Sequence, residues 1–270
     1  GSTLAKEVVR SIVIPDVEPS LHFKTSGIYL SAQGSLLLPL ESINIRAAEL
    51  QIEQVYPNNV VHCLRDFNAY RAHATGDLTR TVCKETVTFA QKPNEAQVKP
   101  LDLRKLLGKD PRGAFIVSAG PKDEPWRHER RLILVTDLGL TVKRSAADLL
   151  VWVNALSTAQ PVEGAAVSVY SRANQPLATG ATDANGIAHF KDIAATGDKQ
   201  PFAVAATKDA DTGVVEIEPT RLDDSDLDTG GRPYLAQGYE AFLYGDRGIY
   251  RPGSKVALRA IVRGKEMSGP

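Results

Sequence analysis

The chain has 270 residues, and its 32 lysines and arginines balance its 32 aspartates and glutamates, so the formal net charge is zero. This balance argues against a nucleic-acid or membrane-surface role that depends on bulk positive charge. The length allows one large domain or two ordinary ones, and no stretch approaches the roughly 18 apolar residues that a membrane-spanning helix needs. We therefore expect a globular protein with no nucleic-acid partner and no segment inserted in a membrane.

Residues 1–18 are predicted to be a linker or tag. They begin with Gly1 and Ser2, a pair typical of a cloning remnant, and continue into the charged run TLAKEVVR. If the natural protein is exported, its signal is expected upstream of this sequence.

Short alternating runs broken by turn residues follow this linker. In the run AELQIEQVY, the apolar residues Leu50, Ile52 and Val55 nearly alternate with polar ones, which is typical of a half-buried antiparallel strand. The longer stretch INIRAAELQIEQVYPNNVV is predicted to form two strands joined by a turn at residues 57–59. The next stretch, LRDFNAYRAHA at residues 64–74, favours a helical turn or two.

A β-hairpin is predicted for AFIVSAGPKDEPWRHERRLILVTD, residues 114–137. Apolar residues such as Phe115 enter on its first strand, PKDEPW forms the turn, and Leu132 lies on the returning strand. We expect this hairpin to complete a first domain, residues 19–137.

The second predicted domain, residues 138–235, begins with the strongly β-forming run LLVWVNAL. A meander follows, with a turn at residues 183–186 (DANG) before IAHF, and FAVAATKDADTGVVEIE is predicted to form a hairpin with an acidic turn. The Asp-, Gly- and Pro-rich run TRLDDSDLDTGGRPYLAQGY is typical of an exposed linker. A third domain is expected to begin at residues 236–270, where strands over 241–250 and 255–263 flank an Arg-Pro-Gly turn in which Gly253 adopts a conformation that other residues avoid.

The two predicted domains end alike. Phe115 and Val117, followed by a Lys-Asp pair, are matched about 87 residues later by Phe202 and Val204, again followed by Lys-Asp. This repeat predicts an all-β fold of tandem antiparallel β-sandwiches of the fibronectin III or immunoglobulin-like kind, with a single large barrel as the alternative.

The acidic run resembles part of a calcium loop, because Asp224, Asp226 and Asp228 alternate like the first ligands of an EF-hand. Thr229 then replaces the required glycine and Leu235 the bidentate glutamate, so a solvated interdomain loop is the better interpretation. An irregular calcium site stays open.

No catalytic pattern is present in the sequence. The five histidines are scattered, no serine lies in a Gly-x-Ser-x-Gly elbow, and no glycine-rich segment precedes a helix in the way a phosphate site needs. We expect no enzymatic activity, no metal and no cofactor.

One run has the composition of a protein-interaction site. EPWRHERR combines Trp126 with Arg127, Arg130 and Arg131, and exposed tryptophan and arginine are enriched at binding hot spots. The alternative is a hairpin tip whose tryptophan packs against its own sheet.

Several runs in a fixed order resemble the macroglobulin-like domains of bacterial alpha-2-macroglobulins. The run DRGIYRPGSKVALRAIVR is similar to the segment that opens one such domain, DLDTGGRP to the crossing before it, and LVTDLGLTVKRSAADLLVWVNALSTAQPVEGAAVSVY with LATGATDANGIAHF to the preceding domain. The resemblance covers residues 112–263 and extends, through LPLESINIRAAELQIEQVYPNNV, to about residue 36.

The resemblance implies a scaffold segment of an exported, periplasmic protease trap, with proteases as partners of the whole protein. The family is also associated with penicillin-binding proteins, so a module that docks a cell-wall-synthesis enzyme is the second hypothesis, and an adhesin-like stalk the third. The family's thioester motif, Cys-x-Glu-Gln, is absent: Cys63 is followed by Leu-Arg-Asp and Cys83 by Lys-Glu-Thr. In an exported protein, Cys63 and Cys83 are predicted to form a disulfide, with two buried thiols as the alternative.

Overall fold

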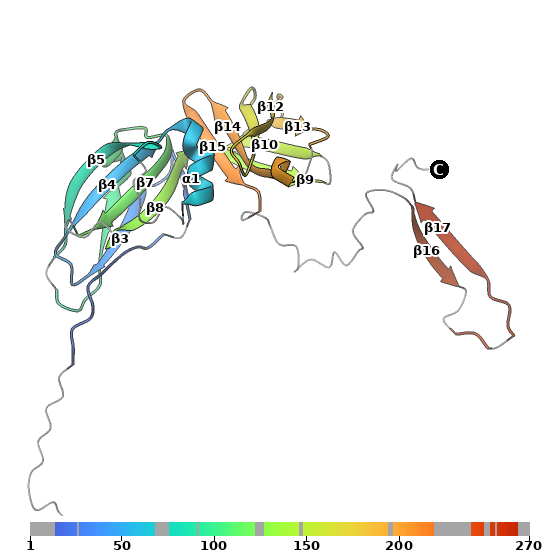
Figure 1. Cartoon of the computed structure of the whole chain (residues 1–270), viewed down its shortest axis with the longest axis horizontal. Helices are drawn as coiled ribbons and strands as arrows, with labels where there is room; N and C mark the ends of the chain where they lie inside the picture. The colour runs from blue at the N-terminus through green and yellow to red at the C-terminus, as the bar shows by residue number, and fades with distance from the viewer. Residues whose placement is uncertain are drawn as a thin grey trace, which may run out of the picture. The chain divides into compact units, whose positions relative to one another are not determined.

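The computed structural model describes residues 14–25, 27–67, 76–90, 92–121, 127–145, 148–193, 197–218, 239–245, 249–251 and 253–263. The chain divides into two compact units, Gly1–Thr220 and Arg221–Pro270. The first unit contains two β-sandwiches and the second contains a β-hairpin (Figure 1).

In the part of the chain that the structure describes, the first sandwich contains eight strands and two short α-helices. Its strands are β1 (Ser20–Phe23), β2 (Tyr29–Ser31), β3 (Leu37–Ile43), β4 (Ala47–Val55), β5 (Thr79–Thr88), β6 (Gln97–Asp102), β7 (Gly113–Gly120) and β8 (Glu129–Thr136). The helices are α1 (Val60–Asp66), which follows a 3₁₀ turn at Pro57–Asn59, and α2 (Leu103–Leu107).

These strands form a three-stranded sheet of order β1-β3-β6 and a five-stranded sheet of order β2-β8-β7-β4-β5. All pairs are antiparallel except β2 with β8. The core between the sheets arises from period-two alternation: on β7, Phe115 and Val117 pack into this core, together with Leu50 and Ile52 from β4 and Ile133 from β8.

The second sandwich contains strands β9 (Leu138–Arg144), β10 (Leu149–Ala155), β11 (Ala166–Ser171), β12 (Pro176–Ala181), β13 (Ile187–Phe190), β14 (Pro201–Lys208) and β15 (Asp211–Glu216), with a 3₁₀ turn at Gly197–Lys199. They form sheets of order β13-β10-β9 and β12-β11-β14-β15. Alternate residues such as Val151 and Val153 of β10 and Val167 and Val169 of β11 fill the core between them.

The predicted turn at residues 183–186 is confirmed and has a physical cause. Asp183 Oδ1 accepts hydrogen bonds from the backbone N–H groups of Asn185 and Ile187, both at 2.9 Å, and Gly186 has a φ of 73°. The turn joins β12 and β13, which belong to different sheets, so the chain crosses the sandwich here instead of forming a hairpin.

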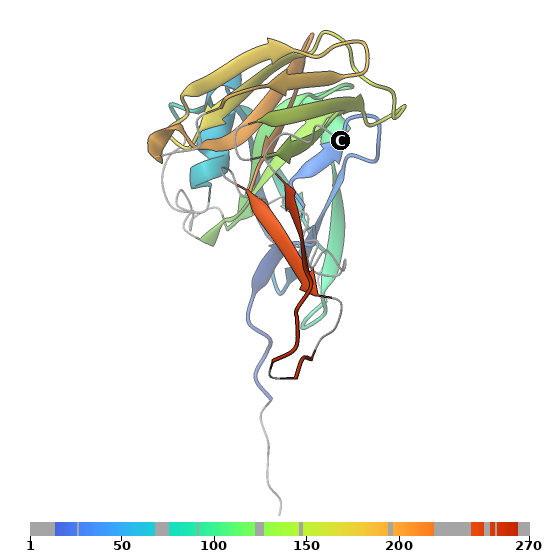
Figure 2. The same ribbon diagram turned by 90° about the vertical axis from the view of Figure 1, so that its right-hand side faces the viewer.

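The second unit contains an antiparallel pair, β16 (Glu240–Gly245) and β17 (Leu258–Arg263), as the sequence predicts, though both strands are shorter than expected. Figure 2 shows the two strands, coloured red, side by side. Near the predicted turn, Gly253 has a φ of 84° and Ser254 N–H donates to Arg251 O at 3.0 Å. Pro252 lies outside the described residues.

The strand predicted after residues 57–59 is wrong. Val60 and Val61 instead begin α1, and both are buried together with Cys63, three residues further along the helix. Tertiary burial of one helix face outweighs the local preference of two β-branched residues for a strand.

Candidate protein-interaction site

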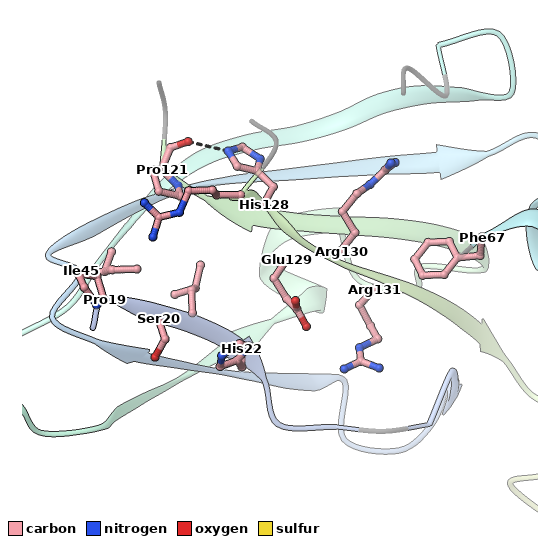
Figure 3. A pocket seen from close by; sticks show the side chains of 12 residues that line it. Pro19, Ser20, His22, Ile45, Phe67, Pro121, His128, Glu129, Arg130 and Arg131 are labelled. Atoms are coloured by element: carbon pink, nitrogen blue, oxygen red, sulfur yellow. Dashed lines mark hydrogen bonds between the residues drawn. The ribbon is translucent and has the colours of Figure 1, made fainter. Parts of the chain in front are cut away.

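A hollow of the first sandwich lies between β1 and the N-terminal half of β8. It has a volume of about 490 Å³. It is lined by Pro19, Ser20, Leu21, His22, Ile45, Phe67, Pro121, Arg127, His128, Glu129, Arg130 and Arg131. We call this hollow the seam, because it separates the edges of the two sheets (Figure 3).

The arginines predicted to form one surface divide between the two faces of the five-stranded sheet. Arg130 is one of the residues lining the seam, but its guanidinium is directed away from it: Nη2 lies 3.7 Å from Glu53 Oε2, and the two side chains are only 14% and 12% exposed. Glu53 is also fixed by Thr79, whose Oγ1 donates to Glu53 Oε1 at 3.0 Å. Arg130 is therefore part of a largely buried ion pair rather than an exposed anchor.

Arg131 and Glu129 point into the seam, on the opposite side of β8 from Arg130 (Figure 3). Arg131 Nε is buried and has no hydrogen-bond partner among the described residues. Next to this pair, Arg127 is exposed, and His128 Nε2 donates to Pro121 O at 2.7 Å. Trp126 lies outside the described residues, so its part in an interaction site stays a prediction.

A second set of polar side chains joins the two sandwiches. Asp211, at the start of β15, accepts from Arg112 Nη1 at 2.6 Å, from Thr136 Oγ1 at 2.7 Å and from the backbone N–H of Asp137 at 2.8 Å. The Asp211 side chain is 14% exposed and that of Arg112 is 19% exposed. These contacts fix the connection between β8 and β9, because two of the donors, Thr136 and Asp137, lie immediately before and within it, while Arg112 precedes β7.

An apolar cluster covers the same boundary. It combines residues of the first sandwich and of α1 with residues of β14 and β15: Val55, Val60, Val61, Cys63, Ala114, Ile116, Leu132, Leu134, Phe202, Ala203 and Val214. Arg172 lies over the ring of Phe202, at 5.4 Å from its centroid, and its carbonyl oxygen accepts from Arg65 Nη1 at 2.7 Å. The sandwiches thus share a continuous core in addition to the chain that connects them.

The predicted disulfide is not formed: Cys63 and Cys83 are both thiols. Cys63 packs in the apolar cluster between the sandwiches, whereas Cys83 packs against the core of the first sandwich. Because adjacent residues of a strand, such as Ile116 and Val117 of β7, belong to these two different clusters, the cysteines lie on opposite faces of the five-stranded sheet. Burial, aided by the charge of Glu85, raises the pKa of the Cys83 thiol.

Two further ionisable groups lie where the sandwiches meet. Burial, and secondarily the Glu216 carboxylate, raise the pKa of Tyr29 to about 12. Burial also raises the pKa of Glu216 above its ordinary value, and Arg172 partly opposes this shift. These shifts follow from partial desolvation at the boundary.

Within the described ranges, no group of three or more His, Cys, Asp or Glu side chains is arranged to hold a metal ion. The acidic run with Asp224, Asp226 and Asp228 lies outside them. In the same part of the chain, none of the helices has both the length and the apolar character needed to cross a membrane.

Comparison with known proteins agrees with the fold. Residues 135–234 match the family model of the bacterial alpha-2-macroglobulin MG3 domain. The chain is 24% identical to an alpha-2-macroglobulin homolog of Yersinia pestis over 97% of its own length, and 25% identical to an alpha-2-macroglobulin of Rickettsia conorii over 99%. It spans 15% of the length of each of these relatives.

Solved structures show the same fold. A crystal structure of native Escherichia coli alpha-2-macroglobulin spanning domains NIE-MG1 has a TM-score of 0.61 and 17% sequence identity, covering 75% of this chain and 99% of that one. The trypsin-activated protein from E. coli has a TM-score of 0.63 and 20% identity, covering 91% of this chain and 17% of that one. The predicted all-β, tandem macroglobulin-like sandwich fold is confirmed. The family-model match over residues 135–234 and the similarity to several relatives along almost the whole chain support the predicted resemblance to bacterial alpha-2-macroglobulins.

Proposed function

We propose that the chain is a scaffold segment of a periplasmic, broad-spectrum protease inhibitor of the alpha-2-macroglobulin type. In this role it holds other parts of a longer polypeptide in position and performs no catalysis itself. Proteases are then partners of the longer protein, as the trypsin-activated state of the E. coli relative suggests for that protein.

The joint between the two sandwiches carries this proposal. A scaffold holds other domains in fixed positions, so its own modules need a fixed mutual orientation. Interfaces between domains of one chain are often too polar and too small to fix that orientation. Here, an apolar cluster and the Asp211 hydrogen bonds act together. Both restrain rotation about the connection at Asp137.

Residual dipolar couplings test the rigidity of the joint in the 270-residue chain. We expect amides of both sandwiches to fit one alignment tensor, because they tumble as one body. Separate tensors for the two sandwiches would remove the structural basis for a scaffold role.

Protection assays test the inhibitor role. The longer polypeptide that carries this segment should protect a large protein substrate from a bound protease, whereas the 270-residue chain alone should give no protection and no cleavage. Stoichiometric protection by the chain alone would show that it has an inhibitory site of its own.

The second hypothesis, docking of a cell-wall-synthesis enzyme such as a penicillin-binding protein, gains no specific support from a contact or charge in the described part of the chain. Co-purification of such an enzyme with the 270-residue chain from a periplasmic extract would revive it.

A further inference from the structure

The seam contains an uncovered strand edge. On the side of β8 opposite β7, β2 pairs only with Leu134–Thr136. Within the described ranges, no strand covers residues 129–133 on that side. Across the seam, β1 is likewise the outer strand of its own sheet.

The backbone of β8 offers hydrogen-bonding groups to this edge. Leu134 N–H donates to Ile28 O at 2.6 Å, and Thr136 O accepts from Ala32 N–H at 3.0 Å, so these two residues direct their backbone groups away from β7. The register between β7 and β8 has no bulge, so alternation along the strand directs the N–H and C=O of Leu132 to the same side. An incoming strand therefore meets a donor and an acceptor at Leu132.

The side chains on the seam face of β8 add charge. Glu129 and Arg131 are two residues apart and point the same way, and Arg131 Nε has no hydrogen-bond partner among the described residues. A buried guanidinium N–H without an acceptor, such as Arg131 Nε, is unfavourable, and a carboxylate would supply the acceptor.

We propose that the seam binds an extended peptide segment of a partner protein by strand addition to β8. The segment has an acidic residue facing Arg131 and a basic residue two positions away facing Glu129. Main-chain hydrogen bonds at Leu132 supply affinity, and the two charge pairs supply specificity, which is the usual division in strand-addition complexes. The volume of about 490 Å³ is within the range of pockets that enclose small ligands.

Fluorescence anisotropy with labelled eight-residue peptides tests this proposal. The probe is a threonine-rich peptide with one aspartate and one lysine two positions apart. The matched control peptides replace aspartate by asparagine, or place the two charges on adjacent residues so that they face opposite sides of the strand. We expect binding of the probe, and at least about tenfold weaker binding of both controls.

Variants of the protein identify the residues responsible. Arg131→Gln should weaken binding of the probe about tenfold, whereas Arg80→Gln, the same change on edge strand β5 at the other end of the sheet, should leave it unchanged. Glu129→Gln should abolish the preference for lysine over glutamine in the probe. If Arg131→Gln does not fold, Arg131→Lys tests the same contact with the charge retained.

Amide hydrogen exchange supplies an independent readout, since the Leu132 amide should become protected when the probe binds. No binding of the probe at millimolar concentration, equal affinity for the probe and both controls, or an equal effect of Arg131→Gln and Arg80→Gln would each overturn the proposal. None of these results bears on the scaffold role, which depends on the joint between the sandwiches.

Discussion

Replacing Asp211 by alanine should weaken the joint between the sandwiches. The effect should be larger than that of removing the other carboxylate that contacts Arg112. The substitution removes three acceptor contacts at once, from Arg112, Thr136 and the backbone N–H of Asp137. Thr136 is 1% exposed, so its hydroxyl cannot readily turn to water for a substitute acceptor.

The magnitude follows from the environment of each contact. Two neutral donors left without an acceptor cost about 1 kcal/mol each, and the largely buried ion pair with Arg112 adds about 1–2 kcal/mol, for a total of about 3–4 kcal/mol. Asp110 provides a matched control: it contacts the same guanidinium at 3.1 Å, but its side chain is 63% exposed. Asp110→Ala should therefore cost no more than about 0.5 kcal/mol.

Urea unfolding followed by far-ultraviolet circular dichroism measures both variants. With an m-value of about 2 kcal/mol/M, Asp211→Ala should lower the midpoint by about 1.5–2 M, and Asp110→Ala by less than about 0.3 M. Equal midpoints for the two variants would refute the assignment of Asp211 as the organising residue of the joint.

Three further predictions follow from local geometry. Thiol titration of the denatured, unreduced protein should count two thiols, because Cys63 and Cys83 lie on opposite sheet faces. Gly186→Ala should cost about 2–3 kcal/mol by urea unfolding, since its φ is 73° and a Cβ would lie 2.5 Å from a carbonyl oxygen, whereas Gly27→Ala has open space and should be near neutral. Asp183→Ala should destabilise at pH 7 and progressively less as the pH falls, because backbone N–H groups lower the pKa of this carboxyl.

Each of these has a clear contrary result. A titration of fewer than two thiols would restore the disulfide, and equal midpoints for the two glycine variants would show that the turn relaxes around a side chain. For Asp183, the folded-state pKa lies below the unfolded one, so its stabilisation is present above the ordinary carboxyl pKa and is lost as pH falls through the folded value. A loss that is the same at pH 7 and pH 2.5 contradicts this.

The strands could be predicted from the sequence because the alternation of apolar and polar residues along them matches the alternation of buried and exposed positions in the fold. Phe115 and Val117 pack in one apolar cluster and Ile116 packs in another, and the strands of the predicted hairpin through Leu132 pair antiparallel. Because of the same alternation, the adjacent residues Arg130 and Arg131 direct their side chains to opposite faces of the sheet. This could have been read from the sequence, but our prediction placed both arginines in one interaction site.

The helix at Val60 and the state of the cysteines could not be predicted in this way. Both depend on α1 packing between the sandwiches, a contact made with residues such as Phe202 that lie more than a hundred positions away. The role of Asp211 was equally hidden, since in sequence it belongs to an ordinary acidic turn. Local patterns carry no information about which distant face such a turn will meet.

The apolar cluster shared by the sandwiches has a consequence for how such proteins can be rearranged. A polypeptide divided after Asp137 would leave Ile116, Leu132 and Leu134 on one piece, and Phe202 on the other, facing water. Apolar patches of this kind promote aggregation. Recombination that moves one sandwich without its neighbour is thus penalised, and we expect the two to be inherited, exchanged and expressed as a pair.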